Sequence, residues 1–384
     1  MIEYLVNRNI MDNDRIDELI KEYTLLYERA NTKSKRKRLA EDLLSISDLY
    51  YNYLGEVKLL LWDKEGLIDD LIFENLYLFF DNIINRKNSY FNISNKVLND
   101  FKNSGYNFNK QYYEEFKYFN YVSRKDFFEI ISEFLNSLDS SLLIDFDKLI
   151  NNKEALFLDS LYNETAFAYS LNNVKSSLLI FNDYFYDKLS IEFAAILLHE
   201  FGHRMEFSLY NDRTCCIDRK ETPLFEISST FLEYSFINYL IDNNIYKDDA
   251  FKYLNRMTRN LFCYSVDMNV FSKMEIDTDR LEESCDLEEF NDKRKDIFNS
   301  YNYFYTGDNS GHDIRNAFIY GLGTIASIYM YDFYKNSPKD FMKIYKNCLL
   351  NYPYSKSFDS FKDVGVSEDI VLNGDLVRKL IKKN

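Results

Sequence analysis

His199-Glu200-Phe201-Gly202-His203 contains two of the three histidines in this chain of 384 residues. Residues i and i+4 lie one above the other on a helical face, so both imidazoles can bind one metal ion while the intervening Glu reaches a metal-bound water. The flanking apolar residues recur at helical spacing and predict a helix over residues 191–207; they are Phe193, Ile196, Leu197, Phe201 and Met205. The alternative is a buried helix with two structural histidines.

The composition describes a globular chain, with 46% hydrophobic and 28% charged residues in 46.1 kDa. Only three Pro and ten Gly interrupt it, which favours long helices. The apolar runs are too short to span a membrane. The N-terminal residues lack the pattern of a secretion signal. We therefore expect no membrane partner.

The formal net charge of −15 opposes nucleic-acid binding, because a nucleic-acid partner requires a basic face. The five Cys form no Cys-x-x-Cys pair, which favours free thiols in a reducing cytoplasm. The adjacent Cys215 and Cys216 are interpreted as two ordinary thiols, with redox activity as the alternative. Nothing in the sequence favours a particular oligomeric state.

Helical periodicity extends from residue 10 to about 135. Ser123 is a predicted N-cap for a helix over residues 123–135, and a second helix is predicted over residues 140–151. The segment 88–110 is rich in Asn, Ser and Tyr and is the best candidate for a change of subdomain.

Two strands are predicted directly before the His199-containing helix, at residues 165–171 and 177–182, since the first alternates and the second is a short apolar run. An extended peptide can add to an exposed strand edge through main-chain hydrogen bonds. The alternative is an ordinary hairpin without a binding role.

A third metal ligand is expected from a second helix in the segment 221–233. Thr222 is a candidate N-cap and Pro223 suits the first turn, which places Glu226 early in this helix. Glu233, seven residues on, falls on the same face as Glu226. Alone, Glu226 is better explained as a first-turn acid favoured by the helix dipole, but its pairing with the upstream histidines favours a metal ligand.

The two motifs, His199–His203 and Phe225-Glu226-Ile227-Ser228-Ser229-Thr230-Phe231-Leu232-Glu233, resemble oligoendopeptidase F and thimet oligopeptidase, gluzincin-type zinc metallopeptidases. The resemblance covers about residues 120–375. It implies a mainly α, helix-rich α+β zincin fold with a small β-sheet beside the HExxH helix, and two lobes around a substrate channel. Residues 1–120 then form a shortened N-terminal helical lobe, and residues 121–384 the catalytic domain.

The resemblance also implies the site: one Zn²⁺ bound by His199, His203 and Glu226, with Glu233 orienting a ligand from outside the coordination shell. Two His and a carboxylate favour zinc over Mn²⁺ or Co²⁺. Glu200 is the expected general base.

His312 and Tyr320 match family residues that contact the tetrahedral intermediate, where a preorganised donor stabilises the developing oxyanion. Phe318 and Leu322 depart from the family, whose members tend to have tyrosines there. Gly307 and Gly311 precede His312 in a predicted flexible loop; hinges of a lid and an ordinary surface loop are equal alternatives for this segment.

These features predict a cytoplasmic zinc endopeptidase that hydrolyses short or unstructured peptides. Three alternatives stay open: a processing peptidase dedicated to one peptide, a catalytically attenuated peptide-binding relative, and a peptidase that trims from one chain end.

Overall fold

The computed structural model describes residues 82–105, 119–151, 155–158, 166–171, 176–182, 189–209, 223–282, 310–355, 358–376 and 380. Helices predominate in these residues. The described segments between residues 121 and 209 belong to one compact unit. Those at 82–105, 119–120 and from 223 onward belong to a second. Most of the predicted lobe at residues 1–120 lies outside the described residues, so the predicted domain boundary stays a prediction. Cys215, Cys216 and Gly307 also lie outside the described residues.

The first unit contains a three-stranded sheet in the order β1-β3-β2. Its strands are β1 (Ala155–Leu158), β2 (Ala166–Leu171) and β3 (Ser176–Asn182). β2 pairs antiparallel with β3, from Ala166 opposite Phe181 to Leu171 opposite Ser176, where the sequence pattern predicts two strands. β1 pairs parallel with β3 and was not predicted, because a four-residue apolar run has no periodicity that distinguishes strand from helix.

Three helices accompany this sheet: α7 (Arg124–Leu138), α8 (Ser140–Asn151) and α10 (Ile191–Leu209). The predicted cap of α7 is confirmed, since the Asp126 backbone N–H donates to Ser123 Oγ at 3.1 Å. α8 has the predicted bounds, and α10 extends two residues beyond the predicted end.

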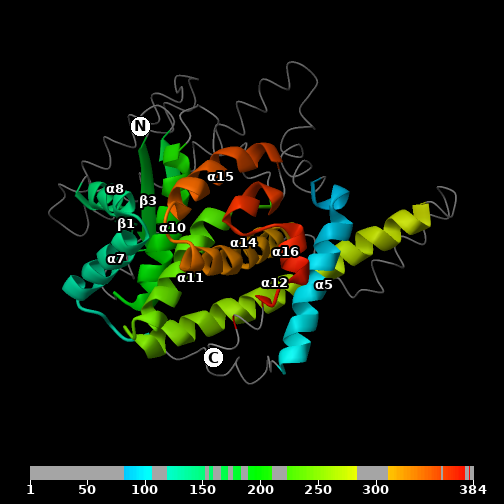
Figure 1. Ribbon diagram of the computed structural model, residues 1–384, viewed down its shortest axis with the longest axis horizontal. Coiled ribbons are helices and arrows are strands. Elements are labelled where there is room, and N and C mark those ends of the chain that lie inside the picture. Colours follow the sequence, from blue (N-terminus) through cyan, green and yellow to red (C-terminus); the bar gives the residue numbers. More distant parts are fainter. Residues whose placement is uncertain are drawn as a thin grey trace, which may run out of the picture. The chain divides into compact units, whose positions relative to one another are not determined.

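The HExxH helix α10, labelled in Figure 1, packs against α7, β2 and β3 of its own unit. Phe193 stacks on Phe127 of α7 at 5.4 Å between ring centroids and meets Phe181 of β3 edge-on at 5.4 Å. One further contact joins Phe201 to Phe146 of α8 at 5.5 Å. Burying two aromatic rings of α10, Phe193 and Phe201, against neighbouring elements fixes the rotation of this helix, and with it the direction of the histidines.

All elements of the second unit in the described part of the chain are helices. Its elements are α5 (Lys87–Ser104), α11 (Ile227–Asp242), α12 (Lys247–Glu282), α14 (Ser310–Asn336), α15 (Phe341–Ser355), the 3₁₀-helix η2 (Phe358–Val364) and α16 (Glu368–Asn373). α14 packs against both α11 and α12, and α5 packs against α12.

Two expectations for this unit are wrong. Residues 88–104 form most of helix α5, and Tyr90, Ile93, Val97 and Phe101 bury one face of it, so this segment is core and not a subdomain change. Gly311 and His312 lie inside α14, which begins at Ser310, so Gly311 is not part of a flexible loop. In α5, packing of an amphipathic helix outweighs the low helix propensity of Asn and Ser.

None of the described helices is long and apolar enough to cross a membrane.

Candidate metal centre

The two histidines of the HExxH motif project from one face of α10. His203 is 6% exposed and His199 is half-buried. Their ring centroids lie 5.2 Å apart with an interplanar angle of 80°, so the rings meet edge to face and do not stack. Ser190 begins the helix, because its Oγ accepts from the Phe193 N–H at 3.1 Å. A capped and packed helix therefore presents both imidazoles in fixed positions.

Glu226 lies at the start of α11, but this helix begins later than predicted. α11 starts at Ile227, so Thr222 is not its N-cap and Pro223 is not in its first turn. Residues 223–226 form a tight turn, in which the Ile227 N–H donates to the Leu224 carbonyl at 3.1 Å. Leu224 is 1% exposed, so this turn is anchored in the core. Glu226 itself occupies the N-cap position.

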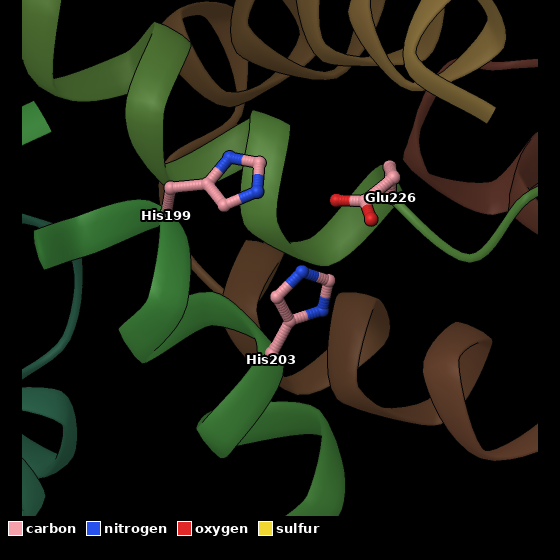
Figure 2. Close-up of side chains that lie close together, drawn as sticks. All are labelled: His199, His203 and Glu226. Atoms are coloured by element: carbon pink, nitrogen blue, oxygen red, sulfur yellow. The ribbon is translucent and has the colours of Figure 1, made fainter. Parts of the chain in front are cut away.

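The three predicted ligands come together. One ligand atom from each of His199, His203 and Glu226 lies within 4.8 Å of the other two, with the Glu226 carboxylate directed towards the imidazoles (Figure 2). Two nitrogens and one carboxylate oxygen are a donor set of catalytic zinc sites, which have three protein ligands and one open position. Glu226 is only 4% exposed, and its Oε2 accepts a hydrogen bond from Ser229 Oγ at 2.6 Å. The residues present fit zinc.

Two further carboxylates of α10 are buried. Glu200, the predicted general base, is 7% exposed and follows His199 directly. Glu206 is fully buried and follows His203 by three residues, on the same face as both histidines. Glu206 was not among the predicted site residues, although its i+7 spacing from His199 was a usable signal.

Glu233 contacts α12. The Tyr253 hydroxyl donates to Glu233 Oε1 at 2.8 Å, and the Arg256 guanidinium lies 4.4 Å from the centre of the Tyr253 ring. Burial, with the charge of Glu233 next, raises the pKa of Tyr253 well above its usual value, so this hydroxyl remains a donor. Seven residues separate Glu233 from Glu226, about 10 Å along a helix. That Glu233 orients a metal ligand stays a prediction.

His312 and Tyr320 both lie on α14. The side chain of His312 is outside the described residues, and its predicted role stays a prediction. Tyr320 is half-buried and stacks on Tyr264 of α12, with ring centroids 6.0 Å apart.

The positions that depart from the family are part of the core. Phe318 and Leu322 are both fully buried. Phe318 packs edge-on against Tyr90 of α5 at 5.4 Å and Phe271 of α12 at 5.9 Å. A hydroxyl at such a position would need a hydrogen-bond partner, whereas a phenyl ring does not. The apolar residues at these positions therefore join helices.

Tyr264 is a second phenol near Glu226 that the sequence analysis missed. Burial raises its pKa to about 12, and the negative charges of Glu233 and Glu226 act in the same direction. Arg315 of α14 is affected by the same carboxylate: burial lowers the pKa of its guanidinium, and Glu226 opposes this. No sequence signal distinguishes Tyr264 from the other tyrosines, which number 33 in total.

The turn that carries Glu226 is approached closely by α14 at Gly323. A Cβ at Gly323 would lie 2.7 Å from Thr230 Oγ1 and 3.0 Å from the Glu226 carbonyl oxygen. Gly321, on the same helix, is also enclosed, but there the nearest atom is the flexible Met268 methyl at 2.8 Å. Only the absence of a side chain at Gly323 permits this contact.

We expect Gly323→Ala to lower the free energy of unfolding by about 1–3 kcal/mol, the usual cost of overpacking a rigid contact. Gly321→Ala is the matched control and is expected to cost clearly less, because Met268 can move. Denaturant unfolding of the two variants measures the difference. Equal losses in both would contradict the importance of this contact.

No protein-family model and no curated protein matches the sequence. Solved structures do. The chain is similar to a protein described as an oligoendopeptidase F from Bacillus anthracis (13% identity, 96% of this chain and 72% of that chain, TM-score 0.45). It is also similar to one described as a peptidase from Chlamydophila abortus (14% identity, 97% and 60%, TM-score 0.49) and to Pz peptidase A bound to an inhibitor (15% identity, 98% and 76%, TM-score 0.43).

Proposed function

We propose that this protein is a zinc-dependent endopeptidase that hydrolyses short or unstructured peptides. The observation that carries the proposal is the grouping of His199, His203 and Glu226, with the buried Glu200 next to His199 on the same helix. Such a set has a specific use in hydrolysis, since three protein ligands leave one metal position for water or substrate.

His199, His203 and Glu226 are the ligands in this proposal. Zinc, when bound, would act as a Lewis acid that lowers the pKa of the attacking water and polarises the scissile carbonyl. Glu200 accepts a proton from the attacking water at its carboxylate and later donates it to the leaving amine. Its burial supports this role, because a poorly solvated carboxylate is a stronger base.

Tyr320 and His312 are the proposed donors to the oxyanion that develops on the scissile carbonyl. The stacking of Tyr320 on Tyr264 supports this assignment, because it restricts the phenol to one orientation. The substrate class follows from the family resemblance, in which a channel between two helical lobes admits only short or unfolded chains.

The test is to incubate the zinc-loaded protein with a mixture of unstructured peptides and to identify the cut sites by mass spectrometry. Internal cuts that a chelator abolishes and zinc restores would support the proposal. Cuts confined to one chain end would replace the endopeptidase by a trimming peptidase. A chain with one zinc ion and no cuts would favour the dedicated processing enzyme or the peptide-binding relative, and a chain that binds no zinc would overturn all of these.

A further inference from the structure

The side chain of Glu226 is held by a hydroxyl from its own helix. Ser229 Oγ donates to Glu226 Oε2 at 2.6 Å and also lies 3.0 Å from the Glu226 carbonyl oxygen. Ser229 is fully buried and Glu226 is 4% exposed. A distance of 2.6 Å is typical of a hydroxyl that donates to an ionised carboxylate, which is a strong hydrogen bond. Buried in this way, the bond is protected from competition by water.

Glu226 occupies an N-cap position without acting as a cap. Its side chain makes no hydrogen bond to the backbone N–H groups of the first turn of α11. An acidic N-cap residue would ordinarily satisfy those donors. The carboxylate instead bonds to Ser229, one turn further along the helix. The N-terminal end of the helix dipole still favours the ionised form of this carboxylate.

The backbone of Glu226 is held from a second direction. Its carbonyl oxygen accepts from both the N–H and the hydroxyl of Thr230. Ser327 of α14 donates to Thr230 Oγ1 at 3.1 Å, and Gly323 allows α14 to lie this close. Thr230, Ser327 and Gly323 therefore connect the Glu226 turn to a neighbouring helix of the same unit.

We propose that Ser229 is a positioning residue that binds Glu226 Oε2 and directs Oε1 to the metal, so that Glu226 is a one-oxygen ligand. This rests on the proposed zinc site and names how its carboxylate is oriented. An ionised carboxylate only accepts hydrogen bonds, so a donor on one oxygen fixes the plane of the group and limits two-oxygen coordination. Partners outside the coordination shell act in this way on ligating carboxylates and are worth about 10–100-fold in metal affinity.

The test compares zinc affinity in the full-length wild type, Ser229→Ala and Ser235→Ala. Ser235 is a matched control on the same helix: it is fully buried, and among the described residues its hydroxyl has no hydrogen-bond partner. Zinc dissociation constants are measured by competition with a chromophoric chelator, and circular dichroism checks the fold of each metal-free protein. We expect about 10–100-fold weaker binding in Ser229→Ala and nearly unchanged binding in Ser235→Ala.

Equal affinities in all three proteins, or equal losses in both variants, would overturn the role of Ser229 while leaving the zinc site intact. A wild type that binds no zinc would instead overturn the proposed function, and the positioning role with it. Ser229→Thr retains the hydroxyl and is expected to bind zinc nearly as the wild type does. If Ser229→Ala does not fold, Ser229→Thr and Ser229→Val, which have the same shape but differ in the hydroxyl, decide: clearly weaker zinc binding in Ser229→Val supports the proposal, and equal affinities in the two contradict it.

Discussion

Glu200→Gln is expected to reduce peptide cleavage by about 10²–10⁴-fold, the contribution of a positioned general acid–base. The substitution keeps the size of the side chain but removes its ability to accept and return a proton. Because Glu200 is not among the proposed ligands, zinc content should remain one ion per chain. Cleavage of an internally quenched peptide, measured beside zinc analysis of the same sample, tests both statements.

Glu192→Gln is the control for this variant. Glu192 lies in the first turn of α10, eight residues before Glu200, and is half-buried, so the same chemical change is made on the same helix. Its activity should match the wild type. Full activity in Glu200→Gln would refute Glu200 as the general base, and loss of zinc from that variant would show that its main role is structural.

Glu226→Gln is expected to weaken zinc binding by more than roughly 10–100-fold, because a charged ligand becomes a neutral amide. That range is the cost of losing a residue that hydrogen-bonds to a ligand, and losing the ligand itself should cost more. The two imidazoles alone would form an incomplete site. In the wild type, zinc at 100 times its dissociation constant should add about 2.7 kcal/mol to the free energy of unfolding. This stabilisation is measured as the rise in Tm when zinc is added. The variant should lose most of that rise, and its peptidase activity as well.

Asp242→Asn is the matched control for Glu226→Gln. Asp242 ends the same helix, where it accepts from the Tyr331 hydroxyl at 2.9 Å and pairs with Lys335 at 3.2 Å. Removing this carboxylate should lower stability slightly and leave zinc affinity unchanged. Glu226→Gln protein that retains one tightly bound zinc ion would exclude Glu226 as a ligand.

Local periodicity explains which features could be predicted. The HExxH helix, the Ser123 cap and the strands at residues 166–171 and 176–182 depend on neighbours within a few residues. The position of Glu226 near the start of a helix was predicted, but the N-cap is Glu226 and not Thr222, because residues 223–226 form a turn. Intrinsic signals locate an element more securely than they locate its ends.

The sequence by itself determined that His199, Glu200 and His203 share one helix with both imidazoles on one face, since residues four apart lie above one another on a helical backbone. The tertiary structure alone decided how the Glu226 turn is supported. Ser327 and Thr230 are 97 residues apart, and Gly323 matters only because α14 packs on that turn. It also decided that Tyr264 stacks on Tyr320 and that Phe318 is core. Such contacts depend on how distant helices pack, and a periodicity confined to one segment has no information about that packing.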